Sequence, residues 1–536
     1  MLINRVSRQL LAAPELLGAM SDLRCGKDVV LSVSQSARTL VLASVWAADP
    51  RPCLFVVSGE EAADRAAKAL AAWLGQDLVL RYPERRDLPW KTDAADDAVI
   101  GARTEAIGRL ACGDPCVVVA SGRSLLRRVP PVGSGYWASS TFSVGDEVPF
   151  EDVGALLVGL GYADVGELDG PGTFHIHGDA VDVFPSQDTV PVRIEFFGDE
   201  IDRVRRMVGA TGQTIGDLES VTVRPCRELA LTDETIARAR KALWTDAQAS
   251  TAVAADLELI EARSPEPSLD RYLAALYGKT ASPLEHIAAE TLVCLGEPRS
   301  LFDDCTRASD EVEQLARNAG AETAGLYTLP RELDFGSQQR LSFASMLRAG
   351  TSVTAELPIR QPGIAGSDTR LLGRVRQLIN DNCAVLFAVP DRATREHLEL
   401  NFGDEHIMFG ESLAQAAENG VPALDPSAND PAAAPPLPRG QVTFIDAAVP
   451  AGIVAPTAKL AVLSVGDLSV RMARHRARRR VDPTSITFPF KPGDYVVHAT
   501  HGIALFADIV RQEVDGKERD YFLLEYAGQD LSLIHI

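Results

Sequence analysis

The sequence predicts a multidomain α/β protein with a small β-rich inserted domain and an all-β C-terminal domain. Three observations support this fold class. Residues 28–130 alternate apolar runs with helical patterns, residues 139–226 are rich in strand patterns, and a new all-β pattern begins at Gly493. At 536 residues the chain is too long for one hydrophobic core. Its composition, 46% hydrophobic and 24% charged, is typical of globular proteins.

The first α/β region begins with a buried strand in residues 52–60, which a helix over residues 60–74 follows. Residues 115–123 repeat this pattern and lead into the segment SLLRRV. Continuous valine runs that alternate with helices are typical of a parallel sheet covered on both faces. Residues 382–400 have the same pattern, so we expect another α/β unit late in the chain.

In the β-rich insertion, a Phe-Pro-Ser-Gln-Asp turn separates two strand-like runs between residues 178 and 202. Side chains alternate between the two faces of a strand. In the second run Val192, Ile194 and Phe196 then form a core stripe. Arg193, Glu195 and Phe197 share the opposite face, where the pattern predicts contact with water. A large aromatic side chain on that face needs an explanation.

Charge, cysteine usage and hydropathy limit the classes of function. A net charge of −21 argues against a general nucleic-acid-coating role. The arginine-rich residues 471–480 are interpreted as a solvated linker, with DNA contact as the alternative. The eight scattered cysteines, including Cys112 and Cys116, form no zinc motif, so we expect reduced thiols and a cytoplasmic protein. We find no signal peptide and no apolar run long enough for a membrane span.

Catalytic and metal-binding motifs are not evident. Gly26 and Lys27 are followed by neither further glycines nor a Lys-Ser/Thr pair, so residues 26–40 contain no phosphate-binding loop. Nor does the chain contain a serine-hydrolase elbow or a zinc-protease motif.

Two histidine groupings could be read as sites. His175, His177 and Asp179 alternate onto one predicted strand face, but a complete metal shell needs a ligand that the sequence does not indicate. We expect a polar strand face and no metal. His498 and His501 are interpreted as structural histidines.

Several segments resemble the transcription-repair-coupling factor (Mfd) family. Residues 172–185 and 191–202, with V-R-P-C-R-E ending at Glu228, resemble the small domain that Mfd shares with the excision-repair protein UvrB. Leu88-Pro89-Trp90 and Arg103 resemble sequence motifs in the first α/β lobe of the family. KPGDYVVHATHGIALF and DYFLLEYAGQD resemble the CarD-like domain, which Mfd has and UvrB lacks. The resemblance covers almost the whole chain and matches the N-terminal part of the family.

The resemblance implies degenerate RecA-like, UvrB-like lobes and a truncated CarD/Tudor-like domain. The implied boundaries are a first α/β lobe without a phosphate loop (1–138), an inserted UvrA-binding-type domain (139–226) and a returning part of the lobe (227–355). A small α/β domain (356–470), an arginine-rich linker (471–488) and an incomplete polymerase-interacting domain (489–536) follow.

Function and partners are implied in the same way. The family couples a stalled RNA polymerase to recruitment of UvrA in nucleotide-excision repair. The implied partners are UvrA and the RNA polymerase β subunit, with double-stranded DNA bound mainly through a motor that this chain lacks. We expect a monomer without enzymatic activity or a cofactor, because ATP and Mg²⁺ belong to the motor of the full-length family. The alternatives are a UvrB-like nucleotide-driven helicase and a stand-alone CarD-type transcription regulator.

The resemblance also implies binding residues. Arg193 and Phe197 match the arginine and second phenylalanine of the family's UvrA-facing pattern. His177 stands where the family has an arginine, and a histidine cannot reproduce a paired contact to a carboxylate. Phe197 could instead cover a neighbouring domain of the same chain. For RNA polymerase, strands around Ile509, Val510, Arg511 and Gln512 are the candidates.

The last residues, LSLIHI, depart from the family pattern, which continues with a further strand. Antiparallel strands in such domains normally close a barrel. We therefore expect these residues to be foreign sequence and the polymerase-interacting domain to be incomplete.

Overall fold

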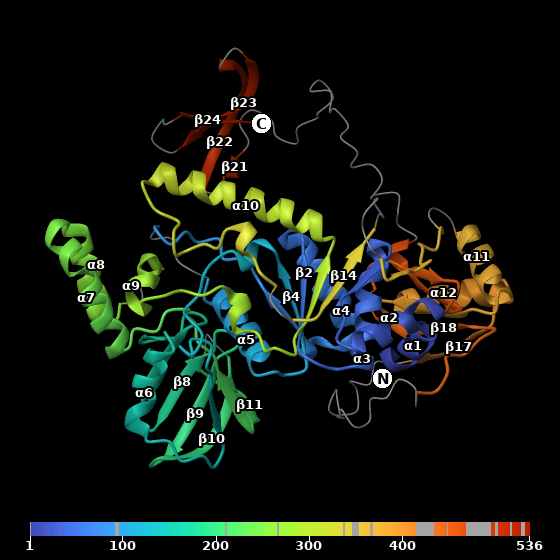
Figure 1. The fold of residues 1–536 in the computed structure, drawn as a ribbon, viewed down its shortest axis with the longest axis horizontal. Coiled ribbons are helices and arrows are strands. Elements are labelled where there is room, and N and C mark those ends of the chain that lie inside the picture. Colours follow the sequence, from blue (N-terminus) through green and yellow to red (C-terminus); the bar gives the residue numbers. More distant parts are fainter. Residues whose placement is uncertain are drawn as a thin grey trace. The chain divides into compact units, whose positions relative to one another are not determined.

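The computed structural model (Figure 1) describes residues 2–91, 96–208, 212–264, 267–335, 338–345, 353–364, 368–413, 434–447, 449–467, 495–498, 502–514, 517–526 and 531–535. The chain divides into two compact units, residues 1–470 and 471–536. In the described portions, every helix is too short or too polar to cross a bilayer.

The first unit is organised around a parallel sheet of seven strands. The strand order is β15-β1-β14-β13-β2-β4-β3, and each pairing is parallel. The central strands β2, β4 and β13 are buried along their whole length, which confirms the parallel sheet expected from the valine runs. The strands are β1 (Val29–Ser32), β2 (Cys53–Val57), β3 (Val79–Tyr82), β4 (Val117–Ser121), β13 (Leu292–Gly296), β14 (Arg340–Ala344) and β15 (Ala355–Glu356).

Helices cover both faces of this sheet. Cys53 and Phe55 of β2 pack into a core with α1 to α4, whereas Leu54 and Val56 pack on the other face with α5 and α10. The predicted two-sided covering is therefore confirmed. The helices are α1 (Leu2–Leu11), α2 (Pro14–Arg24), α3 (Arg38–Ala48), α4 (Glu60–Leu74), α5 (Asp97–Ala111) and α10 (Pro298–Ala319).

The segment after β4 differs from the expected strand-then-helix repeat. Only a short 3-10 turn, Arg123–Leu125, forms there. Pro130 and Pro131 follow closely, and the backbone before a proline is disfavoured in the α region, so the turn does not extend. Elsewhere in the described ranges, 3-10 turns form at Gln35–Ala37, Gln76–Leu78, Pro267–Tyr272, Pro283–His286, Pro330–Glu332 and Val465–Asp467.

The inserted β-rich region forms a six-stranded sheet in the order β11-β10-β9-β8-β7-β6. Strands β8 and β9 pair antiparallel, which confirms the strand pair predicted around the Phe-Pro-Ser-Gln-Asp turn. Helix α6 (Phe150–Gly159) covers one face, and β5 (Ser140–Ser143) pairs with β12 (Ser220–Val223) beside it. The sheet strands are β6 (Ala163–Asp164), β7 (Thr173–His177), β8 (Ala180–Phe184), β9 (Val192–Phe197), β10 (Glu200–Met207) and β11 (Thr214–Leu218).

Two smaller parts complete the first unit. Helices α7 (Asp233–Ala249), α8 (Thr251–Glu261) and α9 (Leu273–Tyr277) pack around their own apolar cluster. A five-stranded sheet, order β17-β18-β16-β20-β19, with α11 (Asp368–Asn380) and α12 (Arg392–Asp404), is the late α/β unit that the sequence predicts. Its strands are β16 (Ala384–Val389), β17 (Phe409–Leu413), β18 (Val442–Asp446), β19 (Ile453–Ala455) and β20 (Leu460–Ser464).

The second unit contains a four-stranded antiparallel sheet, β21-β22-β23-β24. Its strands are β21 (Tyr495–His498), β22 (Gly502–Val514), β23 (Lys517–Tyr526) and β24 (Leu531–His535). Leu531–His535 pair with β23 as a strand, so the sheet pattern continues through these residues of LSLIHI. That these residues are foreign sequence stays a prediction. The arginine-rich residues 471–480 and His501 lie outside the described residues.

Candidate protein-interaction surface

The outer face of the six-stranded sheet presents the residues that the sequence places there. On β9, Val192, Ile194 and Phe196 are buried against α6 and its neighbours. Arg193 and Glu195 are half-buried on the opposite face, and Phe197 is 82% exposed. This confirms the predicted alternation. It also shows that no described residue of the chain covers Phe197.

Arg193 is held by a carboxylate that sequence reasoning missed. Register places Asp182 of β8 directly opposite Arg193. Arg193 Nε donates to Asp182 Oδ1 at 2.7 Å, and Nη2 donates to Oδ2 at 2.8 Å. Because Arg193 donates these hydrogen bonds to the Asp182 carboxylate, the pKa of Arg193 is raised. A paired contact of this kind fixes the plane of the guanidinium group. The remaining N–H groups of Arg193 are therefore presented in a defined orientation.

His177 lies beside the same carboxylate. Its Nε2 is 3.8 Å from Asp182 Oδ2, and its ring stacks on that of His175 with centroids 5.7 Å apart. Asp182 is thus shared by His177 and Arg193, two of the three candidate residues. The histidine occupies the position next to the guanidinium, but it has no paired contact of its own.

Phe197 belongs to the same surface through the register of the strands. His177 pairs with Ala180, and Ala180 pairs with Glu195, so these three residues form one row across the sheet. Phe197 follows Glu195 by two residues on the same face. The structure therefore brings His177, Arg193 and Phe197 onto one surface, which we call the β9 face.

The prediction that His175, His177 and Asp179 share one strand face is wrong for Asp179. His175 and His177 share a face of β7, but Asp179 lies in the tight turn that follows the strand. Gly178 has φ of 59° in that turn, which interrupts the alternation on which the prediction relied. Within the described ranges, no group of three side chains is placed to hold a metal ion.

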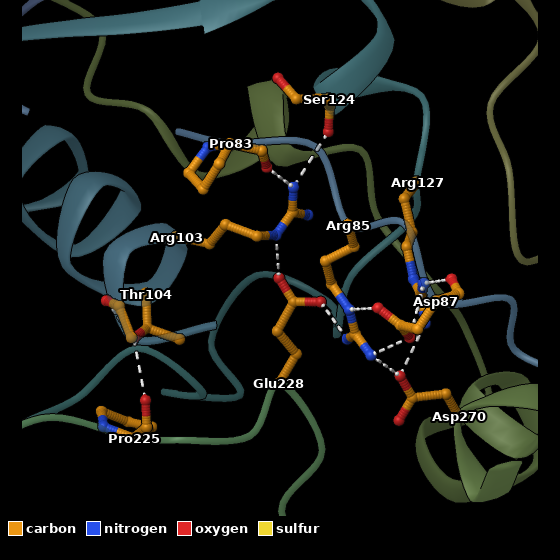
Figure 2. A network of polar contacts seen from close by, with 11 residues as sticks. Pro83, Arg85, Asp87, Arg103, Thr104, Ser124, Arg127, Pro225, Glu228 and Asp270 are labelled. Atoms are coloured by element: carbon orange, nitrogen blue, oxygen red, sulfur yellow. Dashed lines mark hydrogen bonds and ion pairs between the residues drawn. The ribbon is translucent and has the colours of Figure 1, made fainter. Parts of the chain in front are cut away.

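A buried ionic network holds the end of the inserted region against the first lobe (Figure 2). Glu228 accepts hydrogen bonds from Arg103 Nε of α5 at 2.7 Å and from Arg85 Nη1, in the segment after β3, at 2.8 Å. Arg85 also contacts Asp87 and Asp270. Arg127 pairs with the same two aspartates. The network joins segments that lie more than a hundred residues apart.

The charges of this network are buried and mutually compensated. The side chains of Arg85 and Arg103 are 2% and 0% exposed, and that of Glu228 is 5% exposed. Burial would raise the pKa of Glu228, but the charges of Arg103 and Arg85 outweigh it and lower the pKa to about 2. Asp87 is lowered to a pKa of about 2 by the hydrogen bond from Arg85 and the charge of Arg127, against the effect of burial. Both carboxylates are therefore ionised near neutral pH.

The place where a phosphate-binding loop would lie contains an ion pair. At the first residue of α3, near the carboxyl edge of the parallel sheet, Arg38 donates to Glu297 and to Ser345 Oγ. The Arg38 side chain is only 8% exposed, and burial lowers its pKa. Glu297, which follows β13, keeps a lowered pKa despite burial because Ser345 and Arg38 donate to it. The start of α3 therefore engages other protein groups at this edge.

The candidate polymerase-contact residues lie in the second unit. They are Ile509, Val510, Arg511 and Gln512 in the second half of β22, and they pair with Phe522, Tyr521, Asp520 and Arg519 of β23. All four candidate residues therefore lie on the hairpin formed by β22 and β23.

Comparison with known proteins adds independent findings. Residues 141–229 match the UvrB interaction domain family, and residues 490–534 match the CarD-like/TRCF RID domain family. The transcription-repair-coupling factor of Bacillus subtilis (strain 168) is 24% identical over 94% of this chain and 44% of its own length. That of Myxococcus xanthus is 28% identical, over 95% of this chain and 45% of its own length. The factor of Mycobacterium tuberculosis (strain CDC 1551 / Oshkosh) is 26% identical, over 97% of this chain and 43% of its own length.

The similarity to transcription-repair-coupling factors therefore extends over nearly the whole chain. The chain spans less than half the length of these relatives.

Proposed function

From this similarity, we propose that the chain acts in transcription-coupled nucleotide-excision repair, in which it links a stalled RNA polymerase to UvrA. The observation that carries the proposal is the β9 face, where the exposed Phe197 and an oriented Arg193 share one face of a strand within the region that matches the UvrB interaction domain.

The chemistry of the β9 face favours a protein partner. An exposed aromatic side chain gains free energy when a partner removes it from water. Aromatic residues and arginine are also the types that most often anchor interfaces, at about 2 kcal/mol or more on truncation. Arg193 loses little conformational freedom on binding because Asp182 already holds it. UvrA is the partner we assign to this face.

We assign RNA polymerase binding to the second unit. The match to the CarD-like/TRCF RID domain spans the strands β21 to β24, and it supports a CarD/Tudor-like domain that contacts the β subunit around Ile509, Val510, Arg511 and Gln512. Strand hairpins of this type can present both side chains and an open edge to a partner.

We further propose that this chain does not hydrolyse ATP. A UvrB-like helicase needs a glycine-rich loop for the phosphates, and the corresponding segment instead engages Glu297 and Ser345 through Arg38. ATP and Mg²⁺ would belong to a motor in the longer relatives, together with most of the contact to double-stranded DNA. A stand-alone CarD-type regulator would leave the β9 face and both α/β sheets without a role. A cytoplasmic monomer agrees with the proposed role.

The test is a titration of UvrA with the complete 536-residue chain and with Phe197→Ala. We expect binding to weaken at least tenfold, which corresponds to about 1.4 kcal/mol. The matched control is Leu400→Ala on α12, because Leu400 is a similarly exposed apolar residue, at 69%, outside the inserted region. Equal affinities of the wild type and Phe197→Ala would contradict the assignment of this face to UvrA.

A further inference from the structure

A basic cleft lies where the N-terminal helix meets the small α/β domain. Its volume is about 290 Å³, and its walls come from α1, from the segment that precedes β18, and from the turn between β19 and β20. The lining residues are Arg5, Arg8, Gln9, Ala12, Pro436, Arg439, Thr457, Ala458 and Lys459. No acidic side chain is among them.

Hydrogen bonds to backbone carbonyls hold the walls together. Arg5 Nε and Nη2 donate to the carbonyls of Pro435 and Pro436 at 3.2 and 2.8 Å. Gln9 Nε2 donates to those of Ala458 and Lys459 at 3.1 and 2.7 Å. The floor beneath is continuous with the core that joins α1 to the small domain. The cleft is therefore a built feature of the first unit.

The four cations of the cleft carry charge that nearby carboxylates do not neutralise. Among the described residues, Arg5, Arg8, Arg439 and Lys459 take part in no ion pair. The Lys459 ammonium contacts the backbone carbonyl of Asp381 at 3.2 Å. Arg8, Arg439 and Lys459 are exposed to solvent. Four positive charges thus converge on one hollow in a chain whose net charge is −21.

Another cavity of the same unit shows the opposite arrangement. It has a volume of about 630 Å³ and lies between the start of α4, the segment after β3 and helix α10. Its arginines Arg85, Arg123 and Arg127 each form ion pairs with carboxylates of the same neighbourhood. Arg85, Arg123 and Arg127 therefore serve the protein's own network, whereas the cations of the basic cleft remain available to an external anion.

We propose that the basic cleft binds the backbone phosphates of a nucleic-acid duplex. Neutralisation of phosphates by lysine and arginine supplies most of the sequence-independent affinity for nucleic acid. The cleft contains no aromatic side chain on which unpaired bases could stack, so a single strand is disfavoured. Its lining likewise includes no large apolar side chain against which a base could pack, so the phosphodiester backbone is the group that the cleft fits best. This inference does not rest on the proposed function, because it uses only the charges and shape of the cleft.

The test uses the complete chain and a fluorescent 25-base-pair DNA duplex, with binding followed by anisotropy from 50 to 200 mM salt. In the variant Arg439→Glu/Lys459→Asn, asparagine at position 459 tolerates the positive φ of 51°. The matched control is Arg299→Glu/Lys68→Asn, which changes the net charge equally at exposed positions on α10 and α4. Both variants must melt at the wild-type temperature.

We expect the cleft variant to bind the duplex at least tenfold more weakly at 50 mM salt. The slope of log affinity against log salt should fall by about two, because two phosphate contacts are lost. The control should bind within twofold of the wild type. Equal weakening of both variants would overturn the proposal, since it would reduce the effect to overall charge. Saturable binding of inorganic phosphate at the cleft with unchanged duplex affinity would also overturn it, because the site would then take a free anion.

Discussion

Replacing Glu228 by glutamine is expected to destabilise the junction between the inserted region and the first lobe by about 3–5 kcal/mol. Glu228 is buried and accepts from both Arg103 and Arg85. Arg103 also donates to the carbonyls of Pro83 and Ser124, but among the described residues Glu228 is its only acidic partner. The substitution leaves a guanidinium charge with no exposed surface and no counter-charge, which is the costly case for a buried ion.

The lowered pKa of Glu228 provides a second measure of the same effect. Its ordinary value is 4.5, and the folded value is about 2. Each unit of difference corresponds to about 1.4 kcal/mol, so the folded state favours the ionised form by roughly 3 kcal/mol. The expected cost of breaking the buried ion pair and the free energy that corresponds to the pKa shift therefore agree in order of magnitude.

Hydrogen exchange measured on peptides from α5 and from residues 220–229 reports the free energy of opening at this junction. The control is Glu396→Gln on α12, which removes an exposed pair with Arg392. That change should cost less than about 0.5 kcal/mol. The reasoning would be refuted if Glu228→Gln changed the opening free energy of these peptides by less than about 1 kcal/mol, or no more than the control.

The pH dependence has a defined sign. Because folding lowers the pKa of Glu228, its contribution to stability is fully present above pH 4.5 and is lost as the pH falls toward 2. Folding also lowers the pKa of Asp87, from 3.8 to about 2, so its contribution to stability is lost in the same direction as the pH falls. The junction of the wild type should therefore open more readily as the pH falls through this range. Glu228→Gln should show a shallower dependence, and an identical slope in both proteins would contradict the assignment.

The remaining predictions concern binding and catalysis. Arg193→Ala should weaken UvrA binding at least tenfold in titration, and unchanged affinity would separate this residue from the interface. His177→Arg should strengthen UvrA binding, since a guanidinium can form a paired contact to a carboxylate that imidazole cannot. A loss of affinity would argue against a carboxylate of UvrA at this position. Purified chain should show no ATP hydrolysis above background, and steady turnover abolished by Lys27→Ala would overturn this expectation.

Much of the candidate site was accessible from local pattern. The alternation along residues 192–197 predicted which side chains face the core and which face water, and the structure confirms it residue by residue. The prediction for Asp179 was wrong because a tight turn ends the alternation after His177. The alternation along β8 also predicts which face Asp182 lies on, but its ion-pair partner depends on which strand lies beside β8. Only the register of β8 against β9 identifies it as the partner of Arg193.

By itself, the sequence determined the classes of its elements and the direction of their side chains. Strand and helix periodicity are properties of neighbouring residues, so the parallel sheet, the later α/β unit and the exposure of Phe197 could be predicted from short windows. The tertiary structure alone decided the partners of the charged residues. Glu228 meets Arg103 across 125 positions, and Gln9 meets Lys459 across 450. Ion pairs and clefts depend on distances in space between segments far apart in the chain, and local spacing carries no information about those distances.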